Sequence, residues 1–332
     1  MNINVKATRN LSRFTLSLGT CLMLASASAW AGQKVDERMS VDSDSYIDIE
    51  HMNGKAVVKG WDKDEVHVQG ELSERAEEFV FKKRGNRIEI EVEMKHSSHR
   101  EGGWKYWNND GGDDLTIYVP MHSRVQYESV NASFDAENLH GGLSVEVVNG
   151  HVDVNDLTGR IRLESVNGDI RAQKLSGDVH IETVNGSIEG KHSGEGDITF
   201  TSVNGNIYIA SDSREISTET VNGDVQLELQ EVEELDLSTV NGSVEVSMHL
   251  LDNGDVRVSS VGGSVELTFQ ENVSARFDIE GHAGGRFVNR LTDDKMQKDK
   301  YGPRRWLEFS TGSGEAKVEV STVNGRVELS RR

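Results

Sequence analysis

Cysteine is nearly absent from this sequence of 332 residues, in which Cys21 is the single cysteine. That residue lies in an apolar run ending at Ala29-Trp30-Ala31, which fits an Ala-x-Ala cleavage pattern. Basic residues and no acid precede the run, so residues 1–31 are predicted to be a secretory signal peptide, not a membrane span. A mature chain starting after Ala31 has no cysteine, which excludes a disulfide framework and thiol chemistry.

A lipid-modified N-terminus is the alternative for this segment. Leu18-Gly19-Thr20 before Cys21 loosely resembles a lipoprotein cleavage box, but Thr20 is a poor residue at that place. Cleavage after Ala31 is therefore favoured. It predicts an exported protein that stays in the periplasm, with the cell surface or secretion as alternatives.

Long apolar runs and positive charge are also scarce after the signal. No second stretch of about twenty apolar residues follows, so no integral membrane span is expected in the mature chain. Without Lys6, Arg9 and Arg13 it has 33 basic and 56 acidic residues, a net charge of −23. A surface this acidic repels nucleic acid and anionic lipid headgroups, which leaves cationic partners, divalent ions or solubility as its purpose.

A Val-Asn-Gly triplet, or a close variant, repeats along the chain. Its Asn recurs every 18 or 19 residues from Asn131 to Asn241, followed by Gly262 after 21 residues and a last copy at Asn324. Between the triplets apolar and polar residues alternate, which predicts two short strands per repeat. The constant period predicts an all-β fold, a single-stranded β-solenoid (β-helix) with rungs of about 18–19 residues.

Aligned rungs place apolar residues in two columns that are expected to face inward. The first column is Val152, Ile170, Ile188, Ile207, Val225 and Val244, and the second is Ile161, Val179, Ile198, Ile216, Leu235 and Val256. An apolar spacing of two excludes a helical repeat. A sandwich of hairpins with Asn-Gly turns stays an alternative, although the period favours the solenoid.

Both ends depart from this pattern and are expected to cover the exposed end rungs. The predicted parts are the signal peptide 1–31, an N-terminal β capping region 32–128, solenoid repeats 129–270, and a C-terminal cap with the last rung 271–332.

Two polar columns accompany each triplet, and both are given structural roles. Stacked amides are expected to form a hydrogen-bonded Asn ladder of Asn149, Asn167, Asn185, Asn204, Asn222 and Asn241. The following Gly is expected to supply positive φ at the corner. The hydroxyls before each Val are expected to satisfy turn backbone groups, and they belong to Ser165, Thr183, Ser202, Thr220, Thr239 and Ser260.

An outward column is acidic at Glu146, Glu164, Glu182 and Glu219, with Thr201 between the last two. Rungs about 4.8 Å apart bring like charges close together, which is unfavourable unless something compensates them. The hypothesis is that this strip binds Ca²⁺ or a cationic peptide or polymer. A solvated acidic face that helps solubility is the plainer alternative.

A Gly-rich loop at 101–114 carries Trp104, Tyr106 and Trp107. Exposed aromatics can hold sugars or partner surfaces, and packing over the open end of the solenoid is the equal alternative. No histidine recurs beside the serine column to act as a base, so no catalytic residue is expected. His96 and His99 lack a firm metal spacing, so no metal or cofactor is predicted either.

Three segments together resemble the bacterial "putative adhesin" family of β-solenoid domains of unknown function. They are the 60–66 stretch Gly-Trp-Asp-Lys-Asp-Glu-Val, the tandem Val-Asn-Gly rungs, and Ser310-Thr311-Gly312-Ser313-Gly314 before the last triplet. The resemblance covers roughly residues 40 to 330. It implies a secreted or envelope-associated β-helical domain, with no family catalytic residues to carry over.

The predicted function is a non-catalytic, exported cell-envelope protein that acts as an adhesin-like binding or structural module. Envelope polysaccharide, a cationic peptide or another envelope protein are the expected partners. A polysaccharide-acting β-helix enzyme is one alternative, although fold alone is only analogy. A self-assembling envelope scaffold is the other, and charged, covered ends argue against it.

Overall fold

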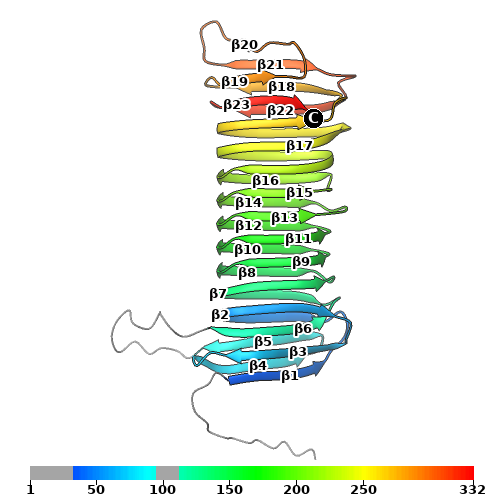
Figure 1. Ribbon diagram of the computed structural model, residues 1–332, viewed down its shortest axis with the longest axis vertical. Coiled ribbons are helices and arrows are strands. Elements are labelled where there is room, and N and C mark those ends of the chain that lie inside the picture. The colour runs from blue at the N-terminus through cyan, green and yellow to red at the C-terminus, as the bar shows by residue number, and fades with distance from the viewer. Residues whose placement is uncertain (1–32, 95–111) are drawn as a thin grey trace, which may run out of the picture. The chain divides into compact units, whose positions relative to one another are not determined.

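The computed structural model describes residues 33–94 and 112–332 (Figure 1). The predicted signal peptide and the loop residues Trp104, Tyr106 and Trp107 lie outside the described residues. Gly32–Arg332 form one compact unit, and its described part consists of strands joined by turns. Within that part, no helix could cross a membrane.

Each central rung has one strand in each of two parallel stacks that enclose a common core (Figure 1). The first-strand stack contains β8 (Leu143–Asn149), β10 (Ile161–Asn167), β12 (Val179–Asn185), β14 (Ile198–Asn204) and β16 (Glu215–Asn222). The second-strand stack contains β9 (Val152–Thr158), β11 (Ile170–Ser176), β13 (Ile188–His192) and β15 (Ile207–Ser211). β17 (Val225–Phe269) then continues through strands of both stacks.

The core confirms the predicted solenoid. All twelve side chains of the two apolar columns are buried, with 3% or less of their surface exposed. Parallel pairing keeps equivalent positions in register, so that Ile161 lies between Leu143 and Val179 of its neighbours. Every rung therefore buries its apolar side chains against those of the next one.

The parallel stack extends into the N-terminal end of the chain. The predicted boundary between the capping region 32–128 and the repeats 129–270 falls inside one of its strands, β7 (Arg124–Leu139). The strands of this end are β1 (Gln33–Ser40), β2 (Tyr46–Trp61), β3 (Glu65–Leu72), β4 (Ala76–Arg84), β5 (Arg87–Met94), β6 (Asp113–Pro120) and β7. β2 pairs in parallel with β7 on one side and with β5 and β6 on the other. Only β4, β3 and β1 beyond them pair antiparallel. Because residues 62–123 separate β2 from β7 in sequence, the 18-residue period does not reveal this rung.

The C-terminal end also departs from chain order. Its strands are β18 (Ala275–Gly281), β19 (Arg286–Asn289), β20 (Gln297–Lys298), β21 (Arg305–Ser310), β22 (Ala316–Thr322) and β23 (Arg326–Arg331). β22 and β23 pair in parallel with the end of β17 on one side and with β18 and β19 on the other. The last rung in sequence is thus not the last in space, since β21 and then β20 close the stack antiparallel.

Asparagine amides form a continuous row along one corner. Each Nδ2 donates to the Oδ1 of the asparagine one rung before it, at 2.8–3.2 Å. The row consists of Asn53, Asn131, Asn149, Asn167, Asn185, Asn204, Asn222 and Asn241. Asn53, in β2, extends it beyond the repeats visible in the sequence.

The glycines after Asn are required for two different reasons. Gly54, Gly150, Gly223 and Gly242 have positive φ, as expected. Gly168 and Gly205 are outside the left-handed region, but a Cβ atom on either would collide with the carbonyl oxygen of the glycine one rung before it. Close approach of rungs, not positive φ, excludes side chains at these two corners.

The buried hydroxyl column behaves as predicted at only two positions. Thr183 Oγ1 donates to the Gly168 carbonyl at 3.4 Å, and Ser260 Oγ donates to the Gly262 carbonyl at 2.9 Å. The remaining four hydroxyls have no hydrogen-bond partner among the described residues, namely Ser165, Ser202, Thr220 and Thr239. These side chains fill the inner corner without satisfying turn groups.

Replacing Asn185 by alanine should destabilise the stack, because Asn185 bonds to both Asn167 and Asn204. Two net hydrogen bonds at about 1 kcal/mol each, reduced by solvent exposure, predict a loss of roughly 1–2 kcal/mol. Urea unfolding measures it. Asn324→Ala is the matched control, because Asn324 has the same triplet but lies outside the ladder. Equal losses in both variants would contradict a stabilising ladder.

Candidate functional site

Six glutamates lie in register on the outer face of the first-strand stack. In spatial order they are Glu91, Glu50, Glu128, Glu146, Glu164 and Glu182. Neighbouring rungs are about 4.8 Å apart. The structure thus brings Glu146, Glu164 and Glu182 together as expected from their spacing, while Thr201 separates Glu219 from them. We call these six residues the glutamate column.

Sequence reasoning missed half of the glutamate column. Glu50 and Glu91 precede the regular repeats, and Glu128 lies one rung before the first glutamate that was considered. The only sequence signal for Glu50 and Glu128 is that each stands three residues before an Asn of the ladder, Asn53 and Asn131. Glu91 has no such signal, and only the pairing of β5 with β2 places it in line.

A second outward column is apolar and runs beside the first, two residues further along each strand. It consists of Met52, Val130, Val148, Val166, Val184, Val203, Val221, Val240, Val261 and Val323. Seven of these side chains are 38–48% exposed, namely Met52, Val148, Val166, Val221, Val240, Val261 and Val323. A row of exposed apolar side chains this long is unusual on a soluble surface and is typical of a binding face. We call it the valine column.

Two shallow hollows follow the valine column. The first has a volume of about 410 Å³ and extends from Glu50 to Glu182, so it is bordered by the glutamate column. The second has the same volume, about 410 Å³, and is bordered instead by hydroxyl side chains such as Ser238, Ser259 and Ser321. We call the first one the acidic trough.

Charge in the acidic trough is only partly compensated. Arg162 forms an ion pair with Glu164, and His180 Nε2 lies 3.7 Å from a carboxylate oxygen of Glu182. Burial, followed by the negative charges of Glu91, Asp48, Glu128 and Glu89, raises the pKa of Glu50. The N-terminal part of the trough therefore holds crowded negative charge that a cation would relieve.

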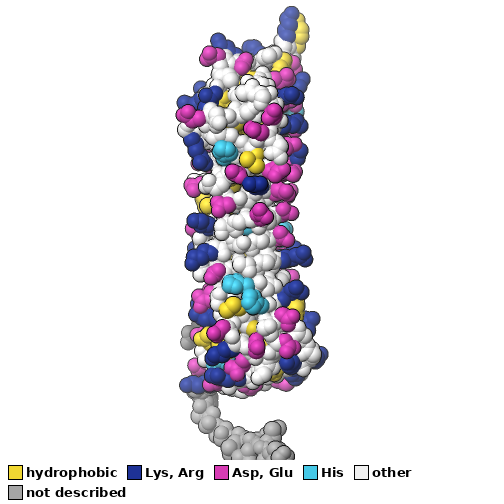
Figure 2. Space-filling view, turned by 90° about the vertical axis from the view of Figure 1, so that its right-hand side faces the viewer, with side chains coloured by type: hydrophobic (Ala, Val, Ile, Leu, Met, Phe, Trp, Pro, Cys, Tyr) yellow, Lys and Arg dark blue, Asp and Glu magenta, His cyan; other side chains and the backbone are white. Residues whose placement is uncertain are grey.

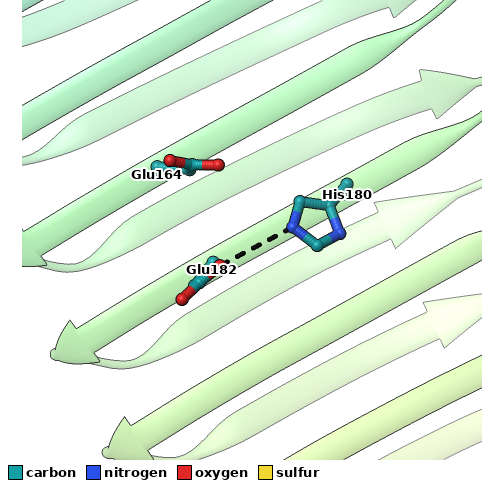
Figure 3. A group of neighbouring side chains, drawn as sticks. All are labelled: Glu164, His180 and Glu182. Atoms are coloured by element: carbon teal, nitrogen blue, oxygen red, sulfur yellow. Dashed lines mark ion pairs between the residues drawn. The ribbon is translucent and has the colours of Figure 1, made fainter.

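One group of described side chains could hold a metal ion: Glu164, His180 and Glu182 (Figure 3). One donor atom from each lies within 4.8 Å of the others. Carboxylate and imidazole together suit a transition metal better than Ca²⁺. However, Arg162 pairs with Glu164 and lies opposite His180 in the next rung, so a metal would have to displace a guanidinium. The sequence prediction of no metal site did not consider this group.

A buried polar network lies behind the N-terminal end of the acidic trough. His51 Nε2 is 3.3 Å from a carboxylate oxygen of Asp113, and both side chains are fully buried. The other ring nitrogen of His51 is 3.1 Å from the Tyr127 hydroxyl, and the Ser73 amide donates to Asp113 at 2.6 Å. Burial by itself raises the pKa of Asp113, but the close His51 ring and the hydrogen bond from the Ser73 amide outweigh it and the net pKa is lowered.

This network was not expected from the sequence, because its members come from three strands distant in the chain. His51 belongs to β2, Asp113 to β6 and Tyr127 to β7. His51 also lines the acidic trough. The trough and the network therefore share one residue.

A profile of the Toastrack DUF4097 family matches residues 44–330. The chain belongs to this family. That assignment confirms the predicted relationship to bacterial adhesin-like β-solenoid domains of unknown function. The Toastrack match covers the rungs, both trough columns and every strand except β1 at the N-terminal end.

Several solved structures are similar to this Toastrack chain, all at low identity and with low TM-scores. A putative adhesin from Bacteroides fragilis is 12% identical, with 90% of this chain and 98% of that chain covered and a TM-score of 0.38. A putative lipid binding protein from Parabacteroides distasonis is 10% identical, with 90% and 97% covered and a TM-score of 0.38. A putative cell adhesion protein from Clostridium sporogenes is 8% identical, with 90% and 100% covered and a TM-score of 0.24. Among curated proteins no match was found.

The His51–Asp113 pair should make the Toastrack chain sensitive to acid. Because the pKa of Asp113 is lowered on folding, its carboxylate stabilises the folded state above an unfolded pKa of about 4. That contribution is lost as the pH falls through the lower, folded value. Calorimetry from pH 6 to pH 2.5 should show the melting midpoint falling in that window.

Asp113→Asn should lower the midpoint at pH 6, by an amount equivalent to roughly 3–5 kcal/mol, and flatten its dependence on acid. Asp114→Asn, at the neighbouring exposed position, is the control and should keep the wild-type profile. An unchanged acid profile in Asp113→Asn would show that other carboxylates control acid stability.

Proposed function

We propose that this protein is a non-catalytic binding module of the cell envelope whose acidic trough holds a linear, cationic, amphipathic peptide. The observation that carries the proposal is the course of the glutamate and valine columns side by side over consecutive rungs. The envelope location rests on the signal peptide predicted for residues 1–31.

The two columns offer complementary chemistry to such a ligand. Carboxylates on one side attract lysine or arginine, and the neighbouring acids that crowd Glu50 increase that attraction. Apolar side chains of the ligand would cover the exposed valines on the other side, and this burial contributes about 25 cal/mol of binding free energy per Å². A ligand with only charge or only apolar groups would use half of the trough.

The length of the acidic trough suits a short extended segment. From Glu50 to Glu182 there are four rung steps, or about 19 Å at 4.8 Å per step. An extended peptide rises about 3.3 Å per residue, so about six residues fit along it. The glutamates repeat about every 4.8 Å, whereas alternate lysines of an extended peptide repeat about every 6.6 Å. The two sets of charges therefore do not pair one to one, which favours binding of many sequences over recognition of a single one.

A fluorescent decapeptide of alternating lysine and leucine should bind the mature protein and be weakened by salt. The triple variant Glu128→Gln, Glu146→Gln, Glu182→Gln should bind it about tenfold more weakly, because exposed charge pairs contribute up to about 1 kcal/mol each. Val148→Ser with Val166→Ser should weaken it by removing apolar contact. Fluorescence anisotropy measures both.

A matched control removes the same amount of charge from the second-strand stack. Glu228, Glu245 and Glu266 are exposed on the second-strand stack, and changing all three to glutamine should leave binding almost unchanged. Equal weakening in both triple variants would mean that net charge alone attracts the peptide, and the trough would not be its site.

A further inference from the structure

The C-terminal end of the stack carries charge of the opposite sign to the rest of the molecule. The whole chain has a net charge of −20, but residues 295–305 contain five basic residues and one acid, a local charge of +4. They form β20, the turn after it and the start of β21, which close the stack. Figure 2 shows Lys or Arg and a hydrophobic group on the protruding tip of this end, above a region where acidic and basic side chains are mixed.

The three lysines among these five basic side chains form no ion pair within the described part of the protein. Arg304 pairs with Glu280, and Arg305 donates to the Gly285 carbonyl. Within the described part of the chain, Lys295, Lys298 and Lys300 have no ion-pair partner. Beside them Tyr301 is 91% exposed, and its ring has Lys300 Nζ 5.2 Å from its centroid. We call Lys295, Lys298, Lys300 and Tyr301 the basic tip.

We propose that the basic tip is an interaction surface that docks the solenoid end-on to an anionic lipid headgroup surface. Lysine ammonium groups are attracted to such a surface. A tyrosine beside them can place its apolar ring and polar hydroxyl at the boundary between lipid and water. The inference does not depend on ligand binding in the acidic trough.

The place of the basic tip in the fold makes this contact compatible with an acidic molecule. Eight strand steps separate β12, which holds Glu182, from β20, or about 38 Å at 4.8 Å per step. Charges that far apart are screened, since the Debye length is about 8 Å at physiological salt. Some acidic side chains lie closer. Asp299 stands between Lys298 and Lys300 in the chain, and those on β18 and β21 lie one or two strands behind β20, where Arg304 already pairs with Glu280.

Protection of an edge strand explains only part of the basic tip. β20 is short and carries lysine, which blocks pairing with another sheet. That role needs no aromatic side chain, yet Tyr301 is the most exposed large hydrophobic residue described. A flat partner also fits an end-on surface better than a long polyanion, which would run from the tip onto the acidic flank.

Vesicle sedimentation tests the proposal with the whole mature protein. It should bind vesicles of 30% phosphatidylglycerol in phosphatidylcholine at 50 mM salt and not bind phosphatidylcholine alone. The triple variant Lys295→Gln, Lys298→Gln, Lys300→Gln should lower the partition coefficient about 100-fold, at about fivefold for each lysine. Tyr301→Ser should lower it several-fold.

The control changes three exposed lysines elsewhere, Lys82→Gln, Lys174→Gln and Lys191→Gln, and should keep most of the vesicle binding. Circular dichroism checks that each variant is folded. No binding to anionic vesicles, or equal losses in both triple variants, would overturn the proposal. Binding to soluble polyphosphate without binding to vesicles would overturn it as well, since the tip would then be a polyanion site.

Discussion

The distance between neighbouring rungs constrains everything else in this molecule. Parallel strands pair at about 4.8 Å, and a rung has too little apolar surface to order its own backbone. Each rung therefore depends on the backbone hydrogen bonds and buried side chains of the next. Glycine at corners such as Gly168 and Gly205 follows from this spacing, because a larger residue would force neighbouring rungs apart.

The same register repeats side-chain chemistry along the stack. An asparagine at one corner position meets another asparagine above and below, which turns isolated surface amides into a hydrogen-bonded row. A glutamate meets other glutamates, and at Glu50 burial together with the neighbouring acids raises the pKa. Stacking thus stabilises the asparagine row and places like charges close together in the glutamate column. The glutamate column lies beside exposed valines, where a cationic ligand would compensate for its negative charge.

Both ends of the stack resolve the problem of an open sheet edge with antiparallel strands, but they differ in charge. At the N-terminal end β1 pairs with β3, and a buried His51–Asp113 pair lies two layers further in, between β2 and β6. At the C-terminal end β20 leaves three lysines without acidic partners within the described part of the chain. The middle rungs have acidic outer faces and an apolar core. Distinct chemistry can therefore be placed at the two ends of the stack.

The sequence by itself determined the all-β class, the 18–19-residue rung and the inward columns headed by residues such as Ile161 and Ile170, because a repeating unit leaves a periodic trace. It also placed Glu146, Glu164 and Glu182 in one line for the same reason. Only the tertiary structure decided what crosses that period. Insertions hide the equivalence of Asn53 with Asn131. β22 returns between β17 and β18, and β23 between β17 and β19, which reverses chain order. Glu50, Glu91, His51 and Asp113 meet only through pairing between distant strands. Pairing of this kind depends on which surfaces fit in three dimensions, and no local pattern in the chain records it.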